Sequence, residues 1–238
     1  MHNSSFNFKK EYNLNMRTQS LEAIILNIKQ IDNNLFLCSF LTQNGVLKLW
    51  ANGLNKPNSK NKANLQIGAV VEIEYFQSRL KNQSGRLKKA HLIKYLNEIN
   101  DSNLNLIMQL VKLFINIDCQ NHLLNIYKQL IGYFNEKINK YLLIYFLAQS
   151  LIYLGICPNF DACRTCGSKR NLIDFELENG GFICNLHNHP KWLPSEVLNT
   201  IWSSFHDVSK YIIITDDKLN NWLFYTYKNA INNAGYYF

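Results

Sequence analysis

Residues 21–51 read LEAIILNIKQIDNNLFLCSFLTQNGVLKLWA, and this stretch decides the fold of the first part of the chain. It holds three short apolar runs, and the turn residues Gln43-Asn44-Gly45 between the second and the third are typical of a β-hairpin. Two more runs follow. Five short strands with no long helical period predict a small closed barrel, and the spacing fits an OB-fold or an SH3-like barrel. The strands are expected at residues 21–28, 35–41, 46–51, 69–76 and 87–96.

Beyond residue 96 the apolar residues recur at spacings of three and four, which predicts helices. The third helix is expected to stop at Gly155, with Pro158 just beyond it. The chain is therefore predicted to be an α+β protein, with a barrel domain at residues 18–96 and an all-helical domain at residues 97–238. The expected helices lie at residues 104–117, 122–134, 138–154, 194–205 and 218–233, with a short apolar run at 211–214 before the last.

Two further segments bear on where the protein acts. Residues 1–17 form a polar leader without the apolar core of a signal peptide, and we expect this leader to be flexible. Residues 141–157 are the one candidate for a membrane span, but they are short and contain Gln149 and Ser150, which favours a buried core helix. We therefore expect a soluble, cytoplasmic protein that does not associate with a membrane.

The composition favours a globular protein with a polyanionic partner. Of the 238 residues, 47% are hydrophobic, which excludes global disorder and a collagen-like structure. The formal net charge is +8, and residues 1–96 carry the whole excess, with 14 Lys or Arg against 5 Asp or Glu. This imbalance predicts that the first part of the chain binds nucleic acid, although a basic surface that serves solubility is the alternative.

Four of the six cysteines fall close together, as in a metal site rather than a disulfide framework. Cys163 and Cys166 form a CxxC, and Cys184 and His187 form a CxxH seventeen residues later. This spacing predicts one Zn²⁺ in a small inserted zinc-finger module at residues 157–190. Four protein ligands leave no position for a reactive water, so the zinc is expected to be structural. Cys157 and His189 are alternative ligands, and Cys38 and Cys119 are expected in the core.

Two clusters of basic residues flank the expected fourth strand, and they are the candidate DNA-binding residues. Long basic loops beside a small barrel form a groove that can follow a phosphate backbone. Trp50, Tyr75 and Phe76 lie in the adjoining strands, where each ring belongs either to the barrel core or to a surface on which bases stack. The basic candidates are Lys56, Lys60 and Lys62 in the first cluster, and Arg79, Lys81, Arg86, Lys88 and Lys89 in the second.

The sequence contains no motif of an enzyme active site. Neither a GxxxxGK[ST] phosphate loop nor a GxSxG nucleophile elbow is present. The carboxylate pairs Glu72/Glu74 and Asp216/Asp217 are interpreted as ordinary surface residues. We therefore expect a protein that binds its partners without catalysing a reaction.

The order of these features resembles the RecO family of bacterial recombination mediators. The resemblance lies in YLGICPNFDACRTCG at residues 153–167, which follows the helical region, and in the later GGFIC at residues 180–184. It covers residues 18–238. It implies an N-terminal OB-fold and places the family's metal ligands at Cys163, Cys166, Cys184 and His187. His187 stands where many relatives have Cys.

The resemblance also implies a function in DNA repair and homologous recombination. Members of the family bind single- and double-stranded DNA and anneal complementary strands coated by single-stranded-DNA-binding protein, whose C-terminal tail is a partner. With RecR they promote loading of RecA, in the RecF pathway, without being enzymes. The alternative is a zinc-ribbon factor of transcription or of the ribosome, which would bind RNA or polymerase.

Overall fold

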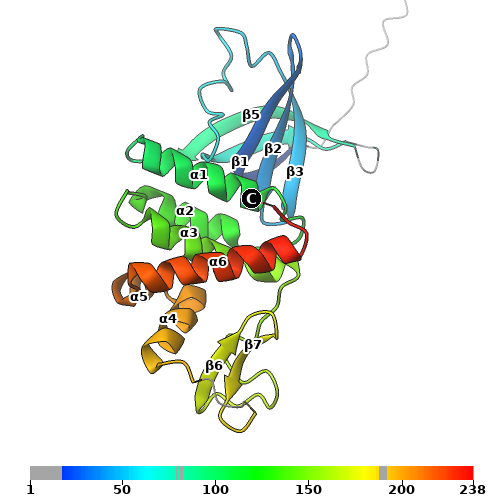
Figure 1. Ribbon diagram of the computed structural model, residues 1–238. Coiled ribbons are helices and arrows are strands. Elements are labelled where there is room, and N and C mark those ends of the chain that lie inside the picture. Colours follow the sequence, from blue (N-terminus) through cyan, green and yellow to red (C-terminus); the bar gives the residue numbers. More distant parts are fainter. Residues whose placement is uncertain (1–17, 79, 81–82, 188–191, 238) are drawn as a thin grey trace, which may run out of the picture.

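The computed structural model describes residues 18–78, 80, 83–187 and 192–237. The first part is a closed five-stranded barrel in the order β1-β2-β3-β5-β4, in which β3 and β5 run parallel. This OB-like barrel confirms the predicted β-barrel (Figure 1). The strands are β1 (Thr18–Asp32), β2 (Leu35–Thr42), β3 (Gly45–Asn52), β4 (Val70–Phe76) and β5 (Gly85–Lys94).

The barrel interior is filled by one alternate set of strand residues. Ile25, Phe40 and Ile73 point inward, and each has no exposed surface. Because successive strand residues face opposite sides, this leaves a second set on the outside of the barrel. Cys38 lies in the interior, as expected, and its burial raises the pKa of the thiol to about 11.

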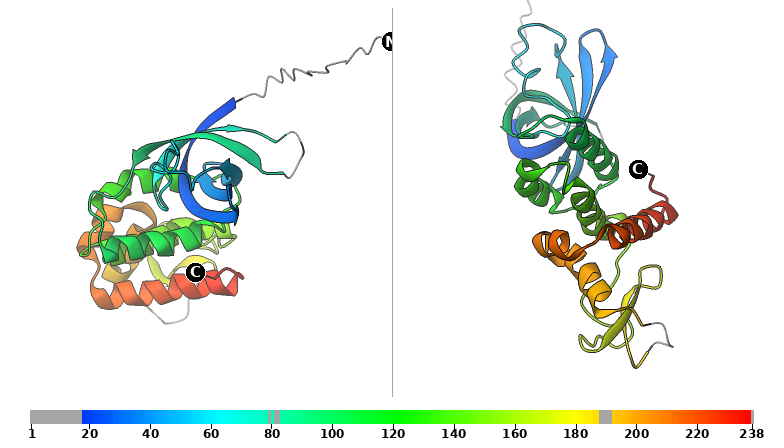
Figure 2. Two further views of the ribbon diagram at one scale, coloured as in Figure 1. Left: turned by 90° about the horizontal axis from the view of Figure 1, so that it is seen from above. Right: turned by 60° about the vertical axis from the view of Figure 1, so that its left-hand side comes forward.

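The helical region follows, as predicted, and lies below the barrel (Figures 1 and 2). Asn100, Asp207 and Asp216 each accept a hydrogen bond from a backbone N–H in the first turn of the helix that follows. The elements are α1 (Asp101–Phe114), α2 (Leu123–Leu130), η1 (Ile131–Tyr133), α3 (Asn139–Leu151), η2 (Ile152–Leu154), α4 (Ser195–His206), α5 (Val208–Ile214) and α6 (Asp217–Asn233).

The structure corrects two details of the sequence analysis. The apolar run 211–214 is the second half of α5, because Asp207 caps a helix that already starts at Val208. Cys119 is exposed rather than buried, since it lies in the connection between α1 and α2. The leader at residues 1–17 lies outside the described residues.

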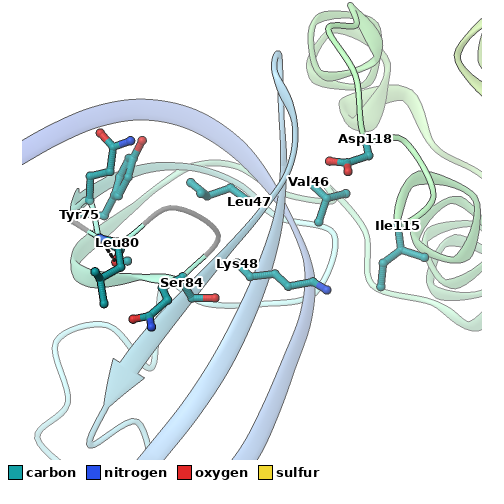
Figure 3. Close-up of a pocket in the computed structure, with 12 residues that line it drawn as sticks. Val46, Leu47, Lys48, Tyr75, Leu80, Ser84, Ile115 and Asp118 are labelled. Carbon is teal, nitrogen blue, oxygen red and sulfur yellow. Dashed lines mark hydrogen bonds between the residues drawn. The ribbon is translucent and has the colours of Figure 1, made fainter.

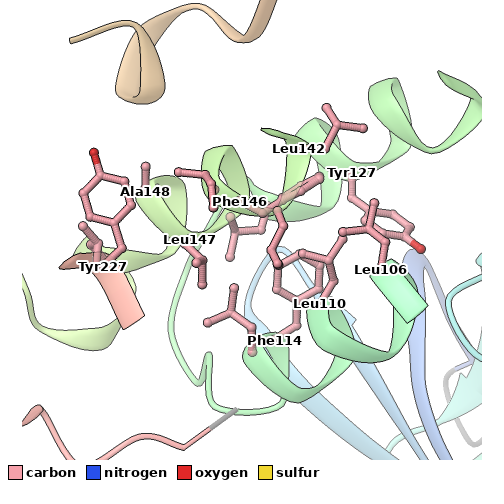
Figure 4. Close-up of a cluster of buried hydrophobic side chains, with 14 of the residues drawn as sticks. Leu106, Leu110, Phe114, Tyr127, Leu142, Phe146, Leu147, Ala148 and Tyr227 are labelled. Atoms are coloured by element: carbon pink, nitrogen blue, oxygen red, sulfur yellow. The ribbon is translucent and has the colours of Figure 1, made fainter. Parts of the chain in front are cut away.

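Helix α3 forms the centre of the helical core. Leu142, Ile144, Phe146 and Leu147 point to different sides of this helix, yet each is at most 1% exposed. Phe146 meets the ring of Phe114 from α1, with ring centroids 5.8 Å apart, as Figure 4 shows. Burial on all sides accounts for the apolar run that had suggested a membrane span. No helix in the described part of the chain has the length and hydropathy needed to cross a membrane.

The barrel and the helices share one continuous core. Ile24, Leu41 and Val70 lie on the outer face of the barrel and pack with residues of α1 and α2. At this junction the hydroxyl of Tyr127 donates a hydrogen bond of 2.7 Å to the carbonyl oxygen of Gly68. Gly68 has a φ of +82°, and a Cβ there would lie 2.5 Å from a methyl carbon of Ile107, so no other residue fits.

Polar contacts surround this apolar junction. The ammonium of Lys128 on α2 lies 2.6 Å and 2.7 Å from the two carboxylate oxygens of Glu22 on β1. Elsewhere, Asn121 donates from its backbone N–H to the carbonyl of Gln43, in the turn between β2 and β3, and from its side chain to the carbonyl of Thr42, the last residue of β2. The helical region is therefore held against the barrel by polar contacts to both β1 and the β2–β3 hairpin.

We predict that Tyr127→Phe lowers the free energy of unfolding by about 1–3 kcal/mol, because it leaves the buried carbonyl of Gly68 without a donor. Burial raises the pKa of the Tyr127 hydroxyl, which keeps it protonated and able to donate. Urea unfolding measures the change. Tyr225→Phe, at a ring that is 62% exposed, serves as the control and is expected to lie within about 0.5 kcal/mol of the wild type. Equal stability of the two variants would contradict the prediction.

Candidate metal centre and nucleic-acid interface

The Cys/His cluster is assembled from a tight turn and a short hairpin at the far end of the molecule from the barrel (Figure 1). The sequence analysis missed the two strands of this hairpin, β6 (Leu172–Glu176) and β7 (Gly181–Cys184). Cys163 and Cys166 lie in the turn, which is closed by a hydrogen bond from the N–H of Gly167 to the carbonyl of Cys163. Gly167 has a φ of +72°, a conformation in which glycine is unstrained.

The side chains of Cys163, Cys166, Cys184 and His187 converge on one point. Their ligand atoms all lie within 4.8 Å of one another, so this group could hold a metal ion. The Sγ atoms of Cys166 and Cys184 are 3.8 Å apart, and Nδ1 of His187 is 3.2 Å from Sγ of Cys184. A tetrahedral zinc ion with Zn–S bonds of about 2.3 Å would place two sulfur atoms about 3.8 Å apart.

The backbone around the cluster favours a thiolate at Cys163. Burial acts to raise the pKa of this thiol, but hydrogen bonds from the backbone N–H groups of Cys166, Cys184 and Thr165 outweigh it and lower the pKa to about 6. Burial and the neighbouring thiols instead raise the pKa of Cys184. Since the thiolate is the form that binds a metal, Cys163 is ready to act as a ligand at neutral pH.

The two alternative ligands differ in where they lie. Cys157 is exposed, and its Sγ faces the carbonyl of Ile152 at 4.0 Å rather than the cluster. It is therefore not part of the cluster, and His187 supplies the fourth group. His189 lies outside the described residues.

The predicted basic residues that the structure describes are all exposed, and the fold brings the two basic segments together. The side chain of Asn61 accepts a hydrogen bond of 3.0 Å from the N–H of Ala90, and Asn64 donates one of 2.9 Å to the carbonyl of the same residue. These bonds hold the loop between β3 and β4 against β5. Lys60 and Lys62 thereby come to lie beside the strand that carries Lys88 and Lys89.

A β-bulge explains how Lys88 and Lys89 can both face solvent. The register between β4 and β5 shifts at this point, so that Leu87 pairs with Tyr75 and Lys89 with Glu74. Lys88 is the extra residue that the bulge inserts into β5, with no paired residue on β4. Its ammonium lies 3.1 Å from the carboxylate of Glu74, and its hydrogen bond and charge lower the pKa of that carboxyl.

Of the remaining basic candidates, the structure describes Lys56 and Arg86. Lys56 and Lys60 line a groove of about 500 Å³, together with Asp32 at the turn between β1 and β2. Arg86 is exposed on β5. Arg79 and Lys81 lie outside the described residues.

A second groove, of about 840 Å³, is lined by residues of β3, of the segment between β4 and β5, and of the connection that follows α1 (Figure 3). Lys48 of β3 borders it, facing Ile115 and Asp118 of the helical region. The sequence analysis did not single out Lys48 or Lys29, which are exposed strand residues outside the two basic clusters. Lys48 stands between two apolar residues, Leu47 and Leu49, and Lys29 follows the apolar Ile28, so alternation within the strand is the signal that could have marked both as outward-facing.

The three aromatic candidates separate into two kinds. Tyr75 is 7% exposed, belongs to the barrel core, and donates a hydrogen bond of 2.5 Å to the side chain of Gln19. It is therefore not available to a base. Trp50 and Phe76 are partly exposed on the outer face.

An OB-like barrel with a basic outer surface, joined to a helical region and a Cys/His centre, has the architecture of a nucleic-acid-binding protein. The family model "Recombination protein O N terminal" matches residues 16–96, and "Recombination protein O C terminal" matches residues 118–192. Together these matches cover more than half of the chain. The chain therefore belongs to the RecO family of DNA repair and recombination proteins.

Curated relatives carry the same family name. A DNA repair protein RecO of Mesoplasma florum is 24% identical over 180 residues, which are 71% of this chain and 67% of the relative. One of Bacillus mycoides is 23% identical over 177 residues, covering 71% of this chain and 70% of the relative. Among solved structures, an asparaginyl-tRNA synthetase of Entamoeba histolytica matches at a TM-score of 0.31 and 9% identity, over 72% of this chain and 41% of its own, a likeness too weak to carry an argument.

We predict that the purified protein binds one equivalent of Zn²⁺ and that Cys166→Ser abolishes this binding. At free zinc about 1,000 times above Kd, the metal should stabilise the wild type by about 4 kcal/mol and leave the variant unchanged. Metal content and thermal unfolding with and without a chelator measure both effects. Cys157→Ser, also at an exposed cysteine, is the matched control and should behave as the wild type. Full zinc binding by Cys166→Ser would exclude this cluster.

Proposed function

We propose that this protein is a mediator of homologous recombination that binds single- and double-stranded DNA through its barrel and anneals complementary strands coated by single-stranded-DNA-binding protein. With RecR it promotes loading of RecA in the cytoplasm. Membership of the RecO family supports this proposal. The observation that carries it is the joining of two basic segments on one edge of the barrel through Asn61 and Asn64.

The chemistry of this edge suits strand annealing. Contacts from Lys and Arg to phosphates do not depend on sequence, and they leave the base edges free to pair. Arg86 and Lys89 are exposed on one strand, with Lys60 and Lys62 on the adjoining loop. The ion pair of Lys88 with Glu74 offsets part of the charge, so the surface holds a strand without making release difficult.

The Cys/His cluster is proposed to hold one structural Zn²⁺. When bound, the ion would supply four coordinate bonds in place of a large core for this small module. The chain's own residues connect the module to the rest of the protein. Phe160 stacks on Phe205 of α4 with ring centroids 4.9 Å apart, and Nε2 of His206 lies 3.0 Å from a carboxylate oxygen of Asp161.

The protein partners, RecR and the C-terminal tail of single-stranded-DNA-binding protein, are proposed from the family alone. An apolar groove of about 420 Å³ lies between α4 and α6 and is lined by Val197 and Trp222. Its rim carries Glu196 and Asp216 against one lysine, Lys218. This charge does not favour an acidic tail, so we do not assign the tail to this groove.

We predict that neutralising Arg86, Lys88 and Lys89 together, each to Gln, weakens binding of single-stranded DNA and flattens its salt dependence. Removing one phosphate contact should reduce the slope of log K against log salt by about 0.7 for a single strand. Fluorescence anisotropy across a salt series measures the slope. The control replaces three exposed lysines outside the barrel by Gln, and it therefore lowers the net charge as much as the triple variant does. These are Lys112, Lys137 and Lys169.

Two further readouts separate the proposal from its rival. The wild type should accelerate annealing of oligonucleotides that carry single-stranded-DNA-binding protein, and the triple variant should be slower. If a folded, zinc-loaded wild type prefers RNA and does not anneal DNA, a transcription or ribosome factor is the better description. An unchanged salt slope in the triple variant would remove this strand from the DNA-binding surface.

A further inference from the structure

The register of the barrel strands aligns a row of residues across the part of the outer face that the helices leave open. Lys29 pairs with Leu37, Leu37 with Trp50, Trp50 with Arg86, and Arg86 with Phe76. Directly paired residues point to the same face of a sheet, and neighbouring strands are about 4.8 Å apart. The two aromatic rings therefore flank Arg86 on one surface, with a second cation at the end of the row.

The rings of Trp50 and Phe76 are not needed to fill the barrel. Both are partly exposed, and neither is among the residues that form the barrel core in the described part of the chain. Both line a groove of about 670 Å³, which Leu35, Leu80 and Arg86 also border. A groove of this size lies within the range of about 300–1,000 Å³ that is usual for small-molecule sites.

The charges around the groove match a nucleic acid strand. Arg86 and Lys29 are exposed, and the ammonium of Lys88 lies 6.0 Å from the ring centroid of Phe76. Glu74 is an acid on the same face of β4, and Lys88 already engages it at 3.1 Å. Aromatic faces alternating with cations form the arrangement that binds single strands through stacked bases and contacted phosphates.

We propose that Trp50 and Phe76 form a platform on which unpaired bases stack, with Arg86 between them binding the backbone phosphate. This inference rests on the proposed function and adds to it that single strands and duplexes are bound by different sets of residues. Bases inside a duplex already stack on their neighbours and do not present their faces, so duplex DNA uses the basic residues alone. On this proposal the platform strengthens binding of single strands but not of duplexes, and it does so without preference for sequence, because every base has a flat face.

The test compares Trp50→Leu with the wild type in binding a single-stranded oligonucleotide and a duplex of equal length at one salt concentration. Single-strand affinity should fall about 5- to 140-fold, the equivalent of the ~1–3 kcal/mol that one stacked base contributes. Duplex affinity and the salt slope should stay as in the wild type, because no phosphate contact is removed. Trp222→Leu, at a tryptophan of α6 that is 41% exposed, is the matched control.

A second measurement uses the wild type alone. An oligonucleotide made of abasic nucleotides keeps the phosphates but offers no bases to either ring, so the wild type should bind it no more tightly than the Trp50→Leu variant binds the normal strand. Equal binding of the normal and abasic strands would overturn the platform, and so would equal losses of single-strand and duplex binding in Trp50→Leu. Unchanged single-strand binding in that variant would overturn it as well. Failure of the wild type to bind any DNA would instead refute the proposed function.

Discussion

The hydrogen bond from Tyr127 to the carbonyl of Gly68 marks the contact on which the arrangement of the molecule depends. A closed barrel has an outer face as well as an interior, and that outer face must be either covered or polar. Here helices α1 and α2 cover the half that carries Ile24, Leu41 and Val70. The uncovered half carries the cations and the two outward rings. The position of the helices thus decides which part of the barrel is left to bind a partner.

The sequence predicted the barrel, the helical region and the Cys/His group, because each depends on local spacing. Alternating apolar residues fix strands, three- and four-residue spacing fixes helices, and two short pairs of ligands fix a metal site. The sequence analysis missed the helix at residues 208–214 and the exposure of Cys119, and in both cases the polar residues directly beside the segment explain the structure. Asp207 caps α5 and extends a short apolar run into a helix, and Cys119 stands between the polar residues Asp118 and Gln120 in an exposed connection.

Features that depend on register could not be predicted. The bulge at Lys88 changes which β5 residue faces which β4 residue, and nothing in the local spacing shows that Lys89 then pairs with Glu74. The contact of the β3–β4 loop with β5 through Asn61 and Asn64 could not be predicted for a different reason. Asparagine is so frequent in this chain that its position says little about local structure. Trp50, Tyr75 and Phe76 looked equivalent in the sequence, and only the register separated the buried ring from the outward two.

A protein that anneals strands must bind them strongly enough to gather them and weakly enough to release the product. Phosphate contacts alone do not meet this need, because a duplex carries more charge than either strand and would be held more tightly than the substrates. Stacking on outward rings resolves the conflict. Its contribution exists only while bases are unpaired, so it disappears as the duplex forms. The basic edge then holds the product by charge alone, and the ion pair between Lys88 and Glu74 limits that charge. Under the proposed function, the loss of stacking on Trp50 and Phe76 therefore helps the paired product to leave, and the lysines and the arginine gather the strands.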